Sequence, residues 1–172
     1  SLILFYERKK MFKIIKEILS YVVIILVVLL IRTYIGTPVR VNGTSMVPTL
    51  KEDNILVLNK LDKSFSREDI VVINKKVEGS TIIKRVIGLP NEKIKCINGT
   101  IFINDEKYDD KYGSGETSDF EEITLGSDEY FVLGDNRTIS KDSRSLGPIK
   151  EKYIEGTTKI ILYPFNKIGK VK

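Results

Sequence analysis

The sequence of 172 residues contains no histidine and a single cysteine, Cys96. Without an imidazole, neither a Ser-His-Asp nor a Cys-His catalytic site can be built, and the commonest zinc ligand sets are excluded as well. A lone thiol forms no internal disulfide and no cysteine-rich metal site. We therefore expect a fold that depends on packing, no metal or other cofactor, and a base other than histidine in any hydrolytic site.

A large charge excess is also lacking, because 28 Lys and Arg residues stand against 23 Asp and Glu residues. Residues 1–17 hold five basic and two acidic residues, and Arg32 adds one more positive charge. Residues 33–172 are left with a net charge of +1, with both signs interspersed. The excess thus belongs to the N-terminus, and no nucleic-acid-binding face is expected on the remainder, which has the length of one domain.

One long hydrophobic run is present, from residue 18 to residue 31, with 14 residues and no charge. This is short for a membrane span, which needs about 20 residues. Extension to Ile35 is possible if the Arg32 guanidinium reaches the interface. The sequence predicts an uncleaved, single-pass transmembrane anchor over 18–35, with the basic residues 1–17 in the cytoplasm and residues 36–172 outside the bacterial cell membrane.

Two other interpretations of the run are less favoured. A cleavable signal peptide would end in small residues, whereas residues 32–38 read RTYIGTP. A buried helix of a soluble protein would not be apolar on every side with a cationic flank at one end. Met11 is an alternative start of the chain, and it keeps Lys13 and Lys16 on the inner side.

Beyond Gly36 the pattern changes to short runs of four to eight residues that are rich in Val and Ile. Asn98-Gly99 lies between two of these runs and predicts a type I′ hairpin. Residues 108–127 are polar and predict a long surface loop or a weakly ordered insertion, and a helical turn is expected over 148–154. The predicted fold is mainly β. The predicted strands are 39–42, 54–59, 69–74, 81–87, 93–97, 100–104, 129–133 and 158–163.

A nucleophile is suggested by Ser45, which follows a predicted strand in a turn between Gly43 and Pro48. Such a turn exposes the hydroxyl and leaves backbone N–H groups free to face an oxyanion. A serine in a Gly and Pro turn is more often only a turn residue, so this segment alone is a weak signal.

A matching base is suggested by Lys84, because alternation along residues 81–87 places it on one face with Ile82 and Val86. Burial of the ammonium would lower its pKa and produce a neutral amine that accepts the serine proton. By alternation alone, a lysine with its stem on the sheet and its head in water is the commoner case.

A third segment, residues 134–144, gathers turn formers and charges of both signs after a predicted strand. Asp142 could pair with Arg144 or with Arg85, and Ser140 could donate a hydrogen bond that orients the lysine amine. Taken alone, this segment would be interpreted as a polar surface turn.

In chain order, these segments resemble the bacterial type I signal peptidases (leader peptidases), and Gly43 resembles their Gram-positive members. Five ordered motifs and an anchor make this resemblance specific, although each motif alone is weak. The matching segments are the serine box 45–50, residues 53–60, residues 67–72, the lysine box 83–90, residues 134–144 and residues 147–149.

The resemblance implies a Ser-Lys dyad in which Ser45 is the nucleophile and Lys84 the general base. It also implies that Ser140 orients the lysine and that Asp142, Arg144 and Arg85 form a supporting network. Some members carry a hydroxyl at the position of Gly43 as a second oxyanion donor, so the second donor is open here. Met46 and Ile83 are expected to contact substrate, with Met46 on a lipid-facing rim.

The implied fold is an antiparallel β catalytic domain over 36–172 with a small inserted β subdomain over about 91–128. The implied function is the removal of signal peptides from secreted preproteins, pilins among them, by cleavage after small residues. The membrane lipid is the other expected partner. A non-catalytic anchored assembly factor or chaperone that holds partner peptides in a peptidase-like groove is the alternative from another class. A self-cleaving repressor shares the Ser-Lys pair, but the anchor makes it improbable.

Overall fold

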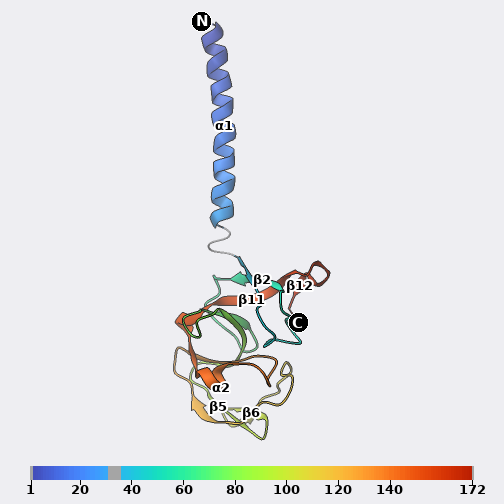
Figure 1. Cartoon of the computed structure of the whole chain (residues 1–172). Coiled ribbons are helices and arrows are strands. Elements are labelled where there is room, and N and C mark those ends of the chain that lie inside the picture. Colours follow the sequence, from blue (N-terminus) through green and yellow to red (C-terminus); the bar gives the residue numbers. More distant parts are fainter. Residues whose placement is uncertain (1, 31–35, 172) are drawn as a thin grey trace. The chain divides into compact units, whose positions relative to one another are not determined.

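The computed structural model describes residues 2–30 and 36–171, which divide into two compact units at the boundary between Gly36 and Thr37. In the first unit, α1 (Leu2–Leu30) is a helix of 29 residues that contains neither Gly nor Pro (Figure 1). Its side chains from Tyr6 to Leu30 are all exposed. Among the described helices, none is both long and apolar enough to cross a membrane. The predicted anchor 18–35 ends in residues 31–35, which lie outside the described part.

The second unit is built on an eight-stranded sheet with the order β1-β2-β11-β3-β4-β9-β10, in which β12 pairs with β11. Every pairing in this sheet is antiparallel. The strands are β1 (Thr37–Arg40), β2 (Ile55–Asn59), β3 (Ile70–Ile73), β4 (Ile82–Gly88), β9 (Glu129–Leu133), β10 (Ile149–Lys150), β11 (Ile154–Tyr163) and β12 (Gly169–Lys170).

A second antiparallel sheet has the order β7-β6-β5-β8 and falls within the range expected for a small subdomain. Its strands are β5 (Lys93–Ile97), β6 (Thr100–Ile103), β7 (Glu106–Lys107) and β8 (Phe120–Thr124). Asn98 and Gly99 join β5 to β6 with φ angles of 51° and 73°, so the predicted tight hairpin is confirmed. The prediction of a mainly β fold is confirmed by the two sheets.

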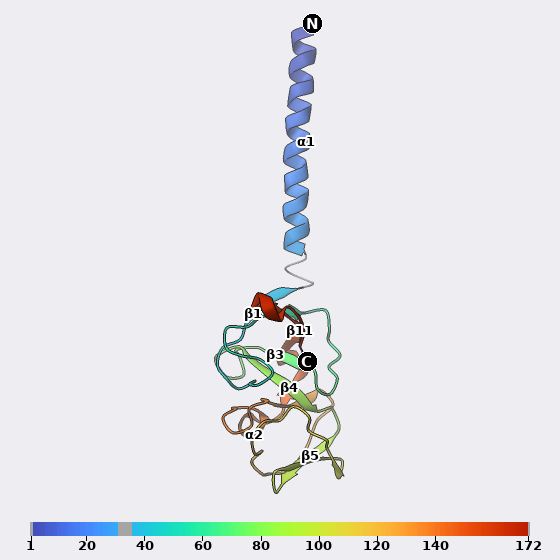
Figure 2. The same ribbon diagram turned by 90° about the vertical axis from the view of Figure 1, so that its right-hand side faces the viewer.

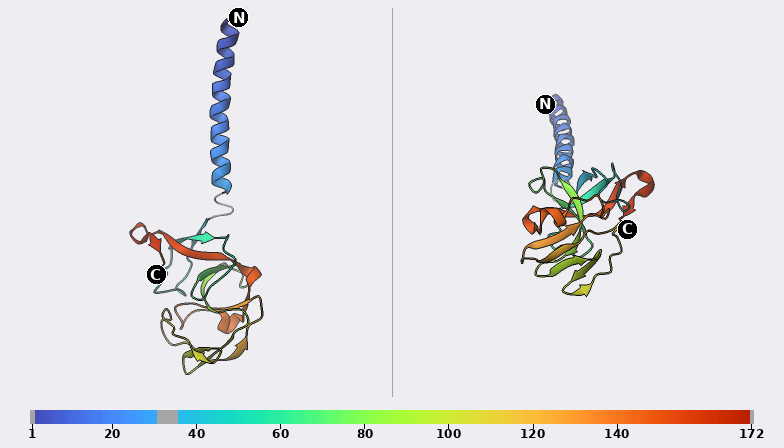
Figure 3. Two further views of the ribbon diagram at one scale, coloured as in Figure 1. Left: turned by 180° about the vertical axis from the view of Figure 1, so that it is seen from behind. Right: turned by 60° about the horizontal axis from the view of Figure 1, so that its bottom comes forward.

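Within the β-rich unit, β5 lies at one end, and β1, β2 and β11 lie at the other (Figures 1 and 2). Figure 3 shows the same arrangement from behind. The two sheets share a core cluster, in which Ile87 and Phe131 of the first sheet pack with Ile94 and Cys96 of the second. In the first sheet, β4 lies between β3 and β9. Six of its seven residues are buried, so β4 is covered on both of its faces.

Residues 108–127 are not the loop that their polar composition predicts, because β8 (Phe120–Thr124) pairs with β5 along one edge of the second sheet. The ring of Phe120 stacks on Phe131 with a centroid distance of 5.0 Å, and Ile123 packs against the shared core. Two apolar side chains among acidic ones are enough to fix this strand, since the sheet edge supplies the hydrogen bonds.

The helical turn expected over 148–154 is only partly present. A 3-10 helix, η2 (Glu151–Tyr153), follows the short strand β10, and a second one, η3 (Phe165–Lys167), follows β11. A single α-helical turn, α2 (Ser143–Leu146), begins just before this region. Asp142 caps α2 by accepting a hydrogen bond from the backbone N–H of Arg144 at 3.3 Å.

Candidate active site

Ser45 lies in the turn that follows β1, and buried apolar side chains fix this turn. Met46 and Leu50 pack in the core beneath it, and the N–H of Leu50 donates to the carbonyl of Met46 at 2.9 Å. Gly43 begins the turn with a φ of 82°, a conformation that favours glycine. The turn thus presents the half-buried Ser45 side chain on a rigid base.

Lys84 reaches this serine from the middle of β4. Its Nζ lies 2.7 Å from Ser45 Oγ, within hydrogen-bonding distance. The residue is only 3% exposed, so the commoner expectation of a lysine head in water is wrong here. The reason is that β4 is a central strand, with β3 and β9 on its two sides.

Burial lowers the pKa of Lys84 from its ordinary value of 10.5, and desolvation is the largest cause. The carboxylates of Asp142, Glu78 and Asp135 act in the opposite direction, whereas the Arg144 guanidinium lowers the pKa further. The net effect is a lowered pKa, so the amine loses its proton more readily than an ordinary lysine. A neutral amine beside a serine hydroxyl can accept its proton, which is the requirement for a general base.

Asp142 and Arg144 form a buried ion pair beside the lysine. Both carboxylate oxygens of Asp142 accept from the guanidinium at 2.9 Å, and one also accepts from the N–H of Gly134 at 3.0 Å. Burial alone would raise the pKa of Asp142, but the hydrogen bonds from Arg144 and Gly134 outweigh it and the pKa is lowered. Asp142 is therefore a fixed negative charge near Lys84.

Arg85 does not pair with Asp142, although the sequence offered it, beside Arg144, as a possible partner of that carboxylate. Its guanidinium instead binds both carboxylate oxygens of the fully buried Asp135 at 2.8 and 2.6 Å. Neighbouring residues of a strand point to opposite faces, so Lys84 reaches Ser45 on one face of β4 and Arg85 reaches Asp135 on the other. The sequence did not predict Asp135 as a site residue. The alternation along β4 could have shown that Arg85 points away from Lys84 and needs a partner other than Asp142.

The hydroxyl of Ser140 makes no hydrogen bond to Lys84 among the described residues. Its Oγ is buried without a partner of ordinary hydrogen-bond geometry, and it lies near enough to Asp142 to help lower the pKa of that carboxyl. A Cβ on Gly134 would lie 2.6 Å from both the Ser140 Cβ and the Ser45 carbonyl oxygen. The absence of a side chain at Gly134 thus lets the two serines approach the same point.

Met46 and Ile83 do not form an exposed rim. Met46 is 1% exposed, and both side chains belong to the core cluster beneath the turn. The expectation that Met46 lies on a lipid-facing rim is wrong, because residue 46 is the buried anchor of the turn rather than its exposed tip. Among the described residues, no group of three His, Cys, Asp or Glu side chains could hold a metal ion.

A further contact that the sequence did not predict holds the serine from the other side. The backbone N–H of Asn136 donates to the carbonyl oxygen of Ser45 at 3.0 Å. The amide group of Asn136 also donates to the carbonyl of Thr44 at 3.4 Å. The segment that follows β9 therefore fixes the backbone of the turn, in addition to supplying the charges around Lys84.

Comparisons with known proteins place this chain in a family. The family described as "Signal peptidase, peptidase S26" matches residues 14–163. Signal peptidase I U of Bacillus subtilis (strain 168) is 37% identical over 170 residues, which cover 90% of each chain. Signal peptidase I P of Bacillus subtilis subsp. natto is 35% identical over 181 residues, with 96% of this chain and 98% of the relative covered.

Among solved structures, the crystal structure of a signal peptidase I from Enterococcus faecalis V583 is similar, with a TM-score of 0.50 and 32% identity. The match covers 56% of this chain and 97% of the other. Sequence and structure agree, and the chain belongs to the signal peptidase family, peptidase S26.

Proposed function

We propose that Ser45 is the nucleophile and Lys84 the general base with which this chain, a signal peptidase I of family S26, removes signal peptides. The observation that carries the proposal is the 2.7 Å separation of Lys84 Nζ and Ser45 Oγ. No histidine is available in the sequence for the same task. A pre-formed nucleophile and base also leave nothing that favours the alternative of a non-catalytic peptide-holding factor.

In the acylation step, the neutral Lys84 amine accepts the Ser45 proton while Oγ attacks the scissile carbonyl carbon. The resulting ammonium then gives its proton to the leaving amine as the C–N bond breaks, and the signal peptide remains as an ester on Oγ. In the second step, Lys84 accepts a proton from water. The hydroxide attacks the ester carbon, the bond from that carbon to Oγ breaks and releases the signal peptide with a free carboxyl group, and Lys84 returns the proton to Oγ. No cofactor enters either step.

The oxyanion of each step needs donors that are fixed before the reaction. We infer that the backbone N–H of Ser45 is one of them, because it donates no hydrogen bond within the described part of the chain. Gly43 is exposed and offers no side-chain donor, so the second donor is a backbone group or water.

The charges behind the lysine have separate tasks in this proposal. Asp142 stabilises the ammonium that forms in the transition state, while Arg144 holds Asp142 in place. Ser140 orients the amine once substrate has shifted it from the resting position. Arg85 acts on the opposite face of β4, where its pair with Asp135 anchors the strand.

The proposed substrates are secreted preproteins that are cut after small side chains, as the family resemblance implies. Residues 18–30 of α1 carry no charge and are exposed, whereas residues 1–17 carry five basic side chains. We therefore propose that the apolar part of α1, continued to residue 35, anchors the chain in the bacterial membrane, with the basic end in the cytoplasm.

The double substitution Ile24→Arg and Val27→Arg is expected to release the chain from membranes. Each arginine at the centre of a span costs about 2.5 to 3.5 kcal/mol. The measurement is the fraction that sediments with membranes after alkaline carbonate extraction. Tyr6→Arg, outside the apolar part, is the matched control and should stay with the pellet. Equal retention of all three proteins would contradict the anchor.

The pH dependence of kcat/KM is expected to rise from acid toward alkaline pH and then level off. The pKa of Lys84 is lowered from 10.5, and the enzyme is active only when the amine is neutral. Glu78 raises this pKa, so Glu78→Gln should lower it further and move the profile to lower pH. Initial rates of preprotein cleavage in detergent micelles, measured from about pH 5 upward, test both statements. A flat profile would refute the role of Lys84.

A further inference from the structure

Residues 110–118 form a segment that we call the strap, between the short strand β7 and the edge strand β8 of the second sheet. Its sequence, DKYGSGETS, is polar and rich in small residues, which predicts a surface loop. In the structure, however, the strap is bonded along its length to the segment that follows β9 and carries Asp135, Asn136 and Asp142. None of the proposed catalytic steps uses the strap.

The first link is made by the backbone. Ser114 pairs with Asn136 in a parallel β-bridge. The N–H of Ser114 donates to the carbonyl of Asp135 at 2.7 Å, and the N–H of Arg137 donates to the carbonyl of Ser114 at 2.9 Å. Between these two bonds, the N–H of Asn136 points to the other side and donates to the carbonyl of Ser45 at 3.0 Å. The strap is therefore two hydrogen bonds away from the nucleophile.

The second link is the side chain of Arg137, which has 0% exposure. Its guanidinium binds both carboxylate oxygens of Asp110 and donates to Thr117 Oγ1 at 3.1 Å. Its Nε donates to the carbonyl of Gly134 at 3.0 Å, which ties it back to its own segment. One buried arginine thus connects the two ends of the strap to the residue that lets Ser45 and Ser140 approach each other.

Two further contacts fix the middle of the strap. The ring of Tyr112 lies on the guanidinium of Arg85 at 3.7 Å from the ring centroid, next to the Lys84 position on β4. A Cβ on Gly113 would lie 2.6 Å from Arg137 Nη1, so a larger residue cannot be accommodated there without displacing the ion pair. The strap therefore touches β4, which carries Lys84, and the segment after β9, which carries the charges around the lysine.

We propose that the strap positions the nucleophile, with Asp110 as its main positioning residue, which acts on Ser45 through Arg137 and Asn136. The inference rests on the proposed function, since it assumes that Ser45 reacts. Asp110 touches neither substrate nor the reacting atoms. Its task is to keep the backbone carbonyl of Ser45 in place, so that Ser45 Oγ stays within hydrogen-bonding distance of Lys84 Nζ. Through the strap, the second sheet then affects the rate of the reaction as well as the stability of the fold.

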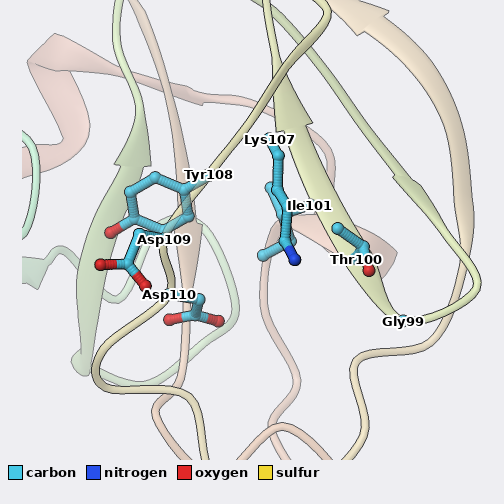
Figure 4. Close-up of a pocket in the computed structure, with 7 residues that line it drawn as sticks. All are labelled: Gly99, Thr100, Ile101, Lys107, Tyr108, Asp109 and Asp110. Carbon is cyan, nitrogen blue, oxygen red and sulfur yellow. The ribbon is translucent and has the colours of Figure 1, made fainter.

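The decisive variant is Asp110→Asn, which keeps the size of the side chain and removes the charge that holds Arg137. Asp109 provides a matched control, because its carboxylate lies beside that of Asp110 (Figure 4). Both residues line the same pocket of about 270 Å³. Asp109 is exposed, so Asp109→Asn removes an equal charge one residue away without touching Arg137.

Asp110→Asn is expected to lower kcat about 10- to 100-fold with little change in KM, since a displacement of about 1 Å at a reacting atom can cost about 100-fold. The segment that Arg137 holds also carries Asp142, whose carboxylate acts on the pKa of Lys84, so displacement of this segment should shift the pH profile as well. Asp110→Glu should recover part of the rate, and Asp109→Asn should match the unchanged enzyme.

A merely structural strap would lower the melting temperature of Asp110→Asn and leave kcat and the pH profile of the folded enzyme unchanged. That result, or an equal loss of kcat in Asp109→Asn, overturns the inference. If Asp110→Asn does not fold, Tyr112→Leu is judged by the same two measurements. Ser45→Ala is assayed in parallel. Activity in Ser45→Ala refutes the proposed function, whereas its loss together with a normal Asp110→Asn refutes only the strap.

Discussion

Ser45→Ala is expected to lower kcat/KM for a preprotein on the order of 10⁴-fold or more, because the alanine cannot form the ester intermediate. The fold should persist, since the neighbours that fix the turn, Met46 and Leu50, are untouched. The measurement is cleavage of a preprotein in detergent micelles, together with the melting temperature of the variant. Thr44→Ala removes an exposed hydroxyl one residue away and should stay within a few-fold of the unchanged enzyme.

Ser45→Cys gives an independent check of the same position, because the chain offers a clean background for thiol chemistry. The single natural thiol, Cys96, is buried, and burial raises its pKa to about 11. An alkylating reagent at neutral pH should therefore modify Ser45→Cys once and leave the unchanged enzyme unmodified. Mass spectrometry reads the stoichiometry. Alkylation that leaves residual cleavage by Ser45→Cys unaffected would speak against Ser45 as the nucleophile.

The strands around the site were predictable because their Val and Ile runs are local signals. Strands β5 and β9 match the predicted ranges, and β4 differs by one residue at each end. Alternation also placed Lys84 on one face with Ile82 and Val86. What alternation could not give is burial, since burial depends on β3, β9 and the second sheet, which are distant in sequence. The decision between a solvated lysine and a desolvated base needed the structure.

The ion pairs were also predictable only where the two charged residues are close in sequence. Arg144 and Asp142 are two residues apart, and their pairing is one of the two possibilities that the sequence offered for Asp142. Arg85 and Asp135 are 50 residues apart, and only Asp142 of the same segment was considered as a partner for Arg85, so this pair was missed. The pairing is settled by the pleat of β4, which points Arg85 away from Lys84.

The predictions for Met46 and for the strap were wrong for two further reasons. A turn has no periodicity, so nothing in residues 43–50 distinguishes the buried anchor Met46 from an exposed tip. The strap is polar because its partner is the buried guanidinium of Arg137, 27 residues beyond Asp110. Composition shows that the strap is polar, but it does not show that these polar residues bind a buried arginine. It therefore predicts a loop where the structure has an ordered connection.

Lys84→Met is expected to combine a large loss of activity with a gain of stability. The thioether accepts no proton, so kcat/KM should fall on the order of 10⁴-fold, and Lys84→Arg should fail equally because a guanidinium stays protonated. Cleavage of the preprotein in micelles provides this measurement. Conservation of the rate in either variant would require a different base.

The stability gain follows from the sign of the pKa shift. The folded state lowers the pKa of Lys84 below the unfolded value of 10.5, so it disfavours the ammonium form. The stability contributed by Lys84 is full above the unfolded pKa and is lost as the pH falls through the folded pKa. Lys84→Met removes this loss. Its melting temperature should exceed that of the unchanged enzyme at neutral pH, and the difference should shrink toward alkaline pH. A variant that is less stable at neutral pH would mean that Asp142 holds the lysine charged, and the neutral base would have to be abandoned.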